Sequence, residues 1–322
     1  MARSNIICGM ISASALVASG VVADPLFSNS SASPAAAALN PVAFSLSGAA
    51  APVGGFFSEA QSVGSTEANM IGGLSAQSIE LTGAYRFADN FVVPAQGWML
   101  QGASFYAYQP GAIGPGSPFA AVNVRIWSGA PGSAGSSVIW GDTLTNRMVG
   151  ASSTATYRIF NSVVPPFAAV PDSTRLIWRV DTGFTKFLAA GTYWIDFQIE
   201  PTDASLQAFV PMVTLPGVRT SAGFDALQFR SSTTNRLGAW EVIMDAGKPA
   251  SAADVAQDIP FLLAGVVGCA ADFNQDMVVD FFDYLDFVDV FATGEMAADF
   301  NHDGIVDFFD YLDLVDAFAL GC

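Results

Sequence analysis

Apolar and polar residues alternate with a period of two through the middle of the chain, from about residue 51 to 266. This alternation is typical of strands that bury one face. Pro-Gly and Thr-Gly turn signals separate the alternating runs, and none of them has a helical period of useful length. The pattern therefore predicts an antiparallel β-sandwich or jelly roll. The expected strands are residues 85–93, 102–108, 121–127, 175–181, 192–200, 226–230, 239–244 and 260–267.

After Gly268 the pattern changes to Asp-rich loops, each followed by an aromatic-rich helical stretch. Residues 272–294 align with residues 299–321, and 17 of the 23 aligned positions are identical. Each copy opens with the pattern D-x-N-x-D-x-φ-V-D-x-x-D, where φ is aliphatic. A tandem repeat this close predicts two copies of one loop–helix unit.

The spacing of oxygen-bearing residues in each repeat matches a calcium loop. Calcium takes about six to eight oxygen ligands, and a loop of about twelve residues supplies them from alternating positions and from its last residue. The sequence therefore predicts two calcium ions. Expected ligands in the first loop are Asp272, Asn274, Asp276, the carbonyl of Val278, Asp280 and Asp283. In the second they are Asp299, Asn301, Asp303, the carbonyl of Ile305, Asp307 and Asp310.

These repeats differ from an ordinary EF-hand, because a short connection before the second loop leaves no room for a full preceding helix. The last loop position is also Asp, where EF-hands usually place Glu. Residues 269–322 resemble the dockerin domain, and the flanking Cys269 and terminal Gly321-Cys322 resemble the GC-type dockerin-anchored proteins of bacterial surfaces. The resemblance implies an α-helical pair of calcium repeats that docks the protein onto an extracellular or surface partner.

Two features depart from the dockerin pattern. Met277 stands where the second loop has Gly304, and because a non-Gly residue at positive φ is strained, we expect the first site to be weaker. Two Phe-Phe pairs occupy positions where cohesin-binding dockerins often carry small polar residues, so a partner other than a cohesin is open. The residues expected to bind this partner are Phe281, Phe282, Phe308 and Phe309.

Both predicted helices are unusually apolar outside an acidic ridge with a spacing of three residues. One interpretation is that the helices bury this surface against each other and against the β-sandwich. The other is that it binds a partner. The ridges consist of Asp283, Asp286 and Asp289 in one helix and Asp310, Asp313 and Asp316 in the other.

The charge distribution agrees with cation binding. The formal net charge is −17, and 13 of the 29 acidic residues lie between Asp272 and Cys322, a stretch without Lys or Arg. This charge argues against nucleic acid and against an anionic membrane surface as partners. Bound divalent cations would relieve the self-repulsion of such a segment.

The N-terminus has the features of an export signal: Arg3, a small apolar run, and a small-residue cleavage site before Asp24. We therefore expect a secreted or cell-surface protein with no membrane span after cleavage. The predicted organisation is a signal peptide (1–23), a Ser/Ala/Pro-rich spacer (24–50), the β-sandwich (51–266) and the calcium-binding module (267–322).

Export also bears on the cysteines, because disulfides persist outside the cytoplasm. Cys269 and Cys322 bracket the acidic module, and a bridge between them would stabilise it. The alternatives are two free thiols, or a terminal cysteine reserved for sorting or attachment.

Few signs of catalysis are present. His302 is the only histidine, which argues against Ser-His and Cys-His hydrolases. Trp127 and Trp194 fall on polar faces of their predicted strands and are candidates for stacking on sugar rings. The expected function is a non-catalytic β-sandwich tethered through its module. The alternative is an extracellular carbohydrate-binding protein, with polysaccharide bound at the sandwich, or a glycoside hydrolase acting through carboxylates there.

Overall fold

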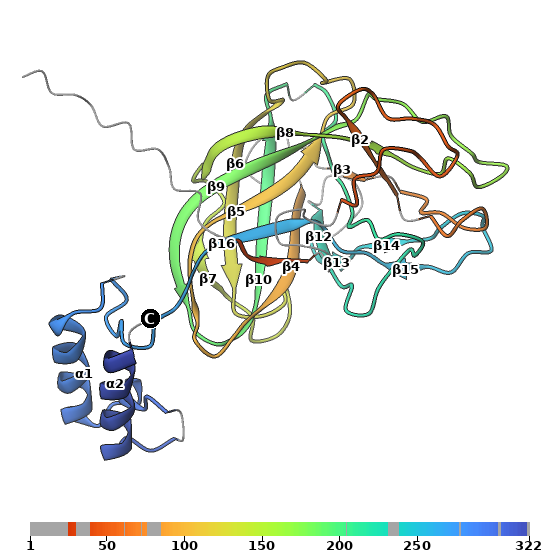
Figure 1. Cartoon of the computed structure of the whole chain (residues 1–322). Coiled ribbons are helices and arrows are strands. Elements are labelled where there is room, and N and C mark those ends of the chain that lie inside the picture. The colour runs from red at the N-terminus through yellow and green to blue at the C-terminus, as the bar shows by residue number, and fades with distance from the viewer. Residues whose placement is uncertain are drawn as a thin grey trace, which may run out of the picture.

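The computed structural model describes residues 25–29, 39–60, 62–71, 73–75, 85–203, 205–230, 238–276, 278–301 and 304–320. These residues form a mainly β domain followed by two α-helices (Figure 1), so the coarse prediction of the fold class is confirmed. Within these ranges no helix is both long enough and apolar enough to span a membrane. The predicted signal peptide, residues 1–23, lies outside them.

The larger sheet contains eight strands of the described chain, with β1, β16, β5, β9, β8 and β2 in spatial order. β11 pairs with β5 and also with β3. Neighbouring strands are antiparallel except for β2 and β8. The strands are β1 (Pro25–Ser28), β2 (Phe56–Glu59), β3 (Leu74–Ser75), β5 (Trp98–Tyr108), β8 (Met148–Ile159), β9 (Leu176–Leu188), β11 (Phe209–Val210) and β16 (Phe261–Val267).

The smaller sheet has the order β13, β12, β4, β10, β6 and β7, and a separate pair joins β14 to β15. Its central strand β10 is antiparallel to both neighbours, and its register sets Trp194 opposite Trp127 and Asp196 opposite Arg125. The strands are β4 (Tyr85–Val93), β6 (Phe119–Trp127), β7 (Val138–Gly141), β10 (Gly191–Pro201), β12 (Leu227–Arg230), β13 (Trp240–Val242), β14 (Met244–Asp245) and β15 (Val255–Ala256).

One apolar core joins the two sheets, because alternate residues of their long strands point toward the opposite sheet. The ring of Phe105 in β5 stacks on that of Phe197 in β10 with centroids 4.0 Å apart. Phe91 of β4 stacks on Trp98 of β5 in the same way at 6.3 Å. The period-two pattern of the sequence therefore arises because every second residue of these strands packs into the shared core.

The outer face of the smaller sheet carries a buried polar layer. Asp196 is fully buried and accepts hydrogen bonds from Arg86 and Arg125, the latter at 2.9 Å. The side chain of Asn123 donates to Gln198 at 3.2 Å beside this pair. Charged groups are rarely buried without such pairing, so this layer is covered by other parts of the chain and is not a solvent-facing surface.

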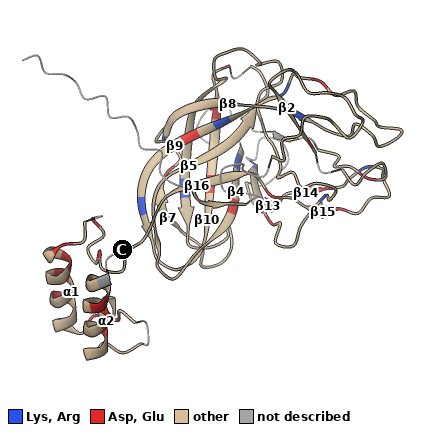
Figure 2. Ribbon diagram, viewed as in Figure 1, with Lys and Arg blue, Asp and Glu red and all other residues tan. Residues whose placement is uncertain are grey.

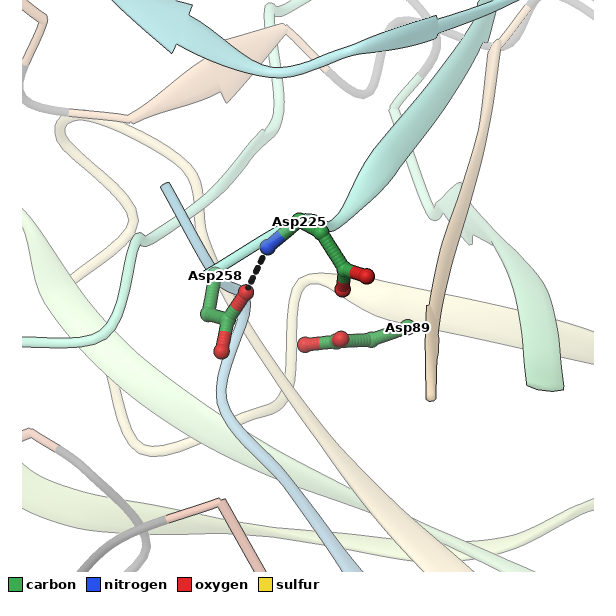
Figure 3. Close-up of side chains that lie close together, drawn as sticks. All are labelled: Asp89, Asp225 and Asp258. Carbon is green, nitrogen blue, oxygen red and sulfur yellow. Dashed lines mark hydrogen bonds between the residues drawn. The ribbon is translucent and has the colours of Figure 1, made fainter. Parts of the chain in front are cut away.

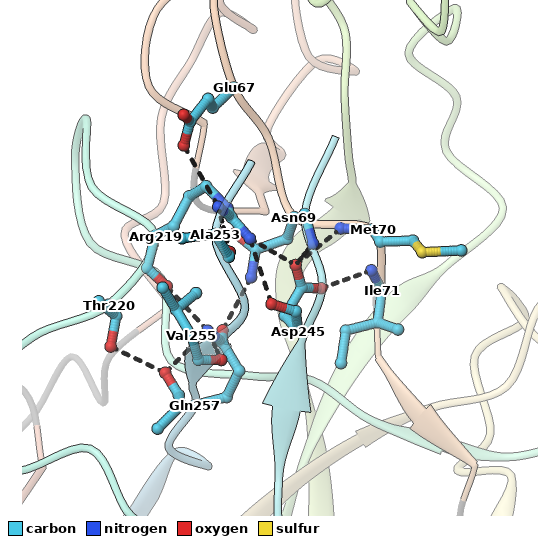
Figure 4. A network of polar contacts seen from close by, with 12 residues as sticks. Glu67, Asn69, Met70, Ile71, Arg219, Thr220, Asp245, Ala253, Val255 and Gln257 are labelled. Carbon is cyan, nitrogen blue, oxygen red and sulfur yellow. Dashed lines mark hydrogen bonds and ion pairs between the residues drawn. The ribbon is translucent and has the colours of Figure 1, made fainter. Parts of the chain in front are cut away.

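A second buried ion pair joins the loops beside β14 and β15 (Figure 4). The guanidinium of Arg219 donates to Asp245 at 3.0 Å and to the more exposed Glu67 at 3.2 Å. Asp245 also accepts the backbone amides of Met70 and Ile71, which anchors that segment to the end of the domain. Gln257 in turn donates to the backbone oxygen of Arg219. The network is a structural tie between distant segments.

The predicted spacer, residues 24–50, is in part a component of the β domain, which corrects that prediction. Residues 25–28 form β1 and pair with β16, and Leu39 is buried. The side chain of Asn29 donates to Asp89 and to the carbonyl of Ile259, so it anchors the end of β1. A Ser/Ala/Pro-rich composition does not reveal such pairing, because the partner strand lies more than 200 residues away in the sequence.

The C-terminal module follows Gly268, whose amide donates to the carbonyl of Gly97 at 2.8 Å. It contains α1 (Phe281–Thr293), the short 3₁₀ helix η3 (Met296–Ala298) and α2 (Phe308–Leu320). The two α-helices lie side by side (Figure 1) around a small core of Phe287, Ala298 and Leu314. Gly294 adopts the left-handed conformation (φ 72°) that ends α1.

Candidate metal centres

The first loop, residues 272–283, is tied to the start of α1 by reciprocal capping. The carboxylate of Asp280 accepts the amide of Phe282 at 2.8 Å, and that of Asp283 accepts the amide of Asp280 at 2.9 Å. Asp283 is fully buried and also accepts the amide of Asn274 at 3.0 Å. Both capping residues are predicted calcium ligands, so the signals for the loop and for the helix start coincide.

Other predicted ligands of the first loop bond to its own backbone. The amide of Asp276 donates to Asp272 and to Asn274, each at 3.0 Å, and the amide of Val278 donates to Asp276 at 2.8 Å. Gln275 has a φ of 64°, a left-handed turn that lets the chain curl around these oxygens. Met277 lies outside the described residues.

The second loop, residues 299–310, repeats this arrangement. Fully buried Asp310 accepts the amides of Asp307 at 2.7 Å, Phe300 at 2.8 Å and Asn301 at 3.2 Å. Burial pushes the pKa of Asp310 upward, but these backbone hydrogen bonds outweigh it and the pKa lies below its usual range.

The turn of the second loop is formed at Gly304. Gly304 has a φ of 87° and donates its amide to Asp299 at 2.9 Å. Only glycine adopts this conformation without strain, so the residue is suited to a tight loop. The predicted ligand Ile305 follows it and is exposed, whereas the predicted ligand Asp303 and the histidine His302 lie outside the described residues.

Two features of these loops suit calcium: the chemistry of their ligand atoms and the path of their backbone. All their candidate ligands are oxygens, which a hard cation prefers, and the last carboxylate of each loop folds back toward the loop. Within the described residues, the carboxylates of the first loop do not gather as a group of three oxygens within 4.8 Å of one another. Their oxygens are held instead by the backbone hydrogen bonds described above.

The two aromatic pairs stand at equivalent places in the two repeats. Phe281, Phe282, Phe308 and Phe309 begin the two helices, and all four are between 63% and 65% exposed. The ring of Phe281 stacks on Tyr284 with centroids 5.8 Å apart, and Phe308 stacks on Tyr311 at the same distance. The two repeats therefore share not only their sequence but also the arrangement of their exposed rings.

The surroundings of these rings are acidic. Figure 2 shows acidic residues along both helices and their loops, and the sequence has no Lys or Arg after Asp272. At the start of the module Cys269 is disulfide-bonded. Its predicted partner, Cys322, lies outside the described residues.

Of the two tryptophans expected to be exposed on the β domain, Trp194 is buried. Trp194 is only 7% exposed and packs against Ala88 and Leu227, so it is not available as a platform for sugar rings. Trp127 is half-buried, donates its indole N–H to Asp196, and lies 4.9 Å beneath the guanidinium of Arg125. The polar neighbours on which that prediction rested belong to the buried polar layer and not to a solvated face.

Three aspartates whose proximity the sequence did not reveal lie close together in the β domain (Figure 3). Carboxylate oxygens of Asp89, Asp225 and Asp258 all lie within 4.8 Å of one another. We call these residues the acidic triad. Asp89 belongs to β4, whereas the other two lie in loops before β12 and before β16. The carboxylate of Asp258 accepts the backbone amide of Asp225 at 2.9 Å.

Burial and mutual repulsion raise the pKa values of the acidic triad. For Asp89, burial and then the nearby charge of Asp258 raise the pKa well above its usual range. Burial raises the pKa of Asp258 to about 6 and also raises the pKa of Asp225. Like charges this close cannot all ionise without compensation, so the triad can share protons or hold a cation. Its members are more than 30 residues apart in the sequence, so no motif could reveal it.

Comparison with protein-family models, with curated proteins and with solved structures gave no significant match.

Proposed function

We propose that this chain is an exported, non-catalytic protein whose β domain is tethered to an extracellular or cell-surface assembly through its C-terminal module. The observation that carries the proposal is the duplication of exposed Phe-Phe pairs directly after the two oxygen-rich loops. Contiguous exposed apolar patches on soluble proteins often mark interaction sites. Their repetition at equivalent positions supports a binding role for both helices.

In this proposal the module is a dockerin-like pair of calcium loop–helix repeats, and the β domain is a β-sandwich or jelly roll. Bound calcium would supply positive charge that offsets the repulsion among the loop carboxylates. The residues that would hold two ions are the twelve predicted ligands, with Asp283 and Asp310 closing the two loops. Their backbone hydrogen bonds would keep each loop in register with its helix.

The chemistry of the module indicates what the partner surface should offer. The aromatic pairs, together with the exposed Leu285 and Leu312, would fill apolar pockets. Acidic side chains surround them without any Lys or Arg, so a rim of basic residues on the partner would complement the charge. A protein partner of this kind is the one that the module fits best.

The proposal is tested by capture from the envelope and secreted fractions of the host, with the full chain as bait, in calcium and in chelator. We expect one partner to be captured only with calcium, and to be lost with the double variant Phe281→Ala/Phe308→Ala. The matched control is Phe44→Ala/Phe167→Ala, which removes two exposed rings from the β domain. A partner retained in chelator, or lost equally with the control, would contradict calcium-dependent docking.

A third possibility is that the Gly-Cys end is a sorting signal that is processed or covalently attached. Intact-mass measurement of the protein from its host would then find a missing or modified C-terminus. An unmodified terminus together with calcium-dependent capture would favour docking.

A glycoside hydrolase remains the alternative from another class, and the acidic triad is the observation that favours it. Glycosidases pair a protonated with an ionised carboxyl group. Burial raises the pKa of Asp89 well above its usual range and that of Asp258 to about 6, so the two carboxyl groups differ in the pH at which they ionise. A pocket of about 260 Å³ adjoins both residues. Release of reducing sugar from polysaccharides that disappears with Asp258→Asn would establish hydrolysis, whereas no release by the full chain would exclude it for the substrates tested.

A further inference from the structure

Two pockets lie on the outer face of the larger sheet, on the opposite side of the domain from Trp127 and Trp194. One has a volume of about 490 Å³ and is lined by Tyr108, and the other, of about 260 Å³, is lined by Tyr106. Phe105 and Ala107 of β5 face the core, so these two tyrosines point outward. They are two residues apart on one strand, which separates them by roughly 7 Å.

The side chains of these tyrosines are largely buried, but each lines one of the two pockets. Each residue is only 3% exposed. Neither hydroxyl bonds another described residue, and neither is among the buried polar atoms that lack a partner, so each is accessible from its pocket. Burial raises the pKa of Tyr108 to about 12, so its hydroxyl remains a donor at neutral pH. A phenol hydroxyl that faces a pocket without a protein partner is free to donate a hydrogen bond to water or to a ligand. Two such hydroxyls on one strand, each facing a pocket, are available to a ligand that spans both.

The other lining residues offer a mixture of hydroxyl groups and flat apolar surface. Ser152, Ser153 and Thr154 line the smaller pocket beside Tyr106. Phe160 and Phe209 line the larger one, and the ring of Phe209 stacks on Tyr108 with centroids 5.4 Å apart. Sugars present both hydroxyl groups and apolar ring faces, so this combination suits them.

The charges in the two pockets are balanced. Arg179 in the smaller pocket pairs with Asp181 at 2.9 Å, and Arg175 in the larger one pairs with Asp172 at 2.9 Å. Each guanidinium therefore carries its own counter-charge. A neutral ligand fits these pockets better than an anion, which the net charge of −17 would also repel.

The backbone beside the smaller pocket is distorted. The register between β8 and β9 shifts between Ser153 and Tyr157, and Ala155 within this bulge has a φ of 54°. A non-Gly residue in this region is strained, and bulges re-aim side chains at binding sites. Thr154 and Thr156, on either side of Ala155, both line the pocket.

We propose that the two pockets are adjoining subsites for a neutral oligosaccharide, with Tyr106 and Tyr108 donating hydrogen bonds to its hydroxyl or ring oxygens. The site lies on the β domain and is independent of the calcium-dependent docking proposed for the module. Failure of one proposal therefore leaves the other standing.

The test measures binding of the full chain in chelator, so that the module does not contribute. Affinity gel electrophoresis with xyloglucan, galactomannan and mixed-linkage β-glucan, together with an array of neutral glycans, should detect binding to at least one of them. Polygalacturonate and alginate, as acidic probes, should not bind. Tyr106→Phe/Tyr108→Phe should weaken binding about tenfold or more, because each lost hydrogen bond corresponds to roughly three- to tenfold in affinity.

The double variant removes only two oxygen atoms, neither of which bonds another described residue, so its unfolding midpoint should stay close to that of the wild type. Tyr85→Phe, on the smaller sheet, is the matched control and should leave binding unchanged. The proposal is overturned if no neutral glycan binds, if the double variant retains wild-type affinity, or if the acidic probes bind as tightly as the neutral ones.

Discussion

The carboxylate of Asp310 accepts the backbone amide of Asp307 at 2.7 Å, so the last acidic residue of the second loop is folded back over the start of α2. Asp283 has the same relationship to Asp280 at 2.9 Å in the first loop. These two carboxylates are buried, while most other acids of the module are exposed or half-buried. Asp283 and Asp310 therefore connect each loop to the first turn of the helix that follows it.

Replacing these carboxylates tests the predicted calcium sites. Asp310→Asn keeps the size of the side chain but removes its charge, and calcium affinity depends on the charge of the ligands. We expect the calcium affinity of the second loop to fall roughly tenfold or more, as measured by titration calorimetry. Asp316→Asn removes the same charge from the exposed side of α2 and should change affinity little. Equal losses of calcium affinity in the two variants would mean that only net charge matters, and would contradict the role of Asp310 as a ligand.

Replacing a buried and an exposed aromatic residue of the module should change its stability by different amounts. Phe287 is fully buried, so Phe287→Ala should destabilise the module by about 3 kcal/mol or more. Phe281→Ala removes a ring that is mostly in solvent and should cost less than about 1 kcal/mol. Chemical unfolding followed by far-ultraviolet circular dichroism measures both. A large loss of stability with Phe281→Ala would mean that the ring packs inside the protein and would weaken the interface proposal.

The acidic triad should make the stability of the β domain depend on pH. The pKa of Asp258 is about 6 in the folded protein, above the value of about 4 expected when unfolded. Between these values the folded state holds a proton that the unfolded state has lost, so the contribution of Asp258 to stability is full below about pH 4 and falls as the pH rises to 6. Asp258→Asn should flatten this part of the profile, by on the order of 2 kcal/mol.

Thermal unfolding in chelator between pH 4.5 and 7.5 measures this dependence. Asp142→Asn is the control, since hydrogen bonds from Thr145 and Leu144 lower the pKa of Asp142 and move its titration below this range. A wild-type profile with no fall between pH 4.5 and 6, or the same fall in Asp258→Asn, would refute the assignment.

The buried polar layer of the smaller sheet should be essential for folding. Asp196→Ala would leave Arg86 buried without its counter-charge, and loss of one member of a buried ion pair costs about 3–5 kcal/mol. The exposed pair of Asp142 and Arg147, 3.8 Å apart, is the comparison, and Asp142→Ala should cost less than about 1 kcal/mol. Urea unfolding of the two variants gives both values. Similar values would show that Asp196 is more hydrated than its burial implies.

The strands with clear alternation were predictable. The prediction for residues 85–93 coincides with β4, and those for residues 121–127 and 192–200 fall within β6 and β10. β8 was missed because its Gly, Ser and Thr residues carry no strong apolar period. β1 was missed because its four residues are a strand only through pairing with β16. The finer type of β architecture stays a prediction.

The sequence by itself determined the repeated loop–helix units, because their capping bonds and candidate ligands come from residues within about a dozen positions of one another. It also determined which strand positions alternate, since a pleated strand has a fixed period of two. It could not determine which of two faces would be covered. Trp194 lies beside polar residues in the sequence, and it is buried only through packing with side chains such as Ala88 and Leu227, which come from other strands. The acidic triad and the pocket-facing hydroxyls of Tyr106 and Tyr108 were likewise decided by tertiary structure, because both depend on segments that are remote in sequence and adjacent only after the two sheets pack.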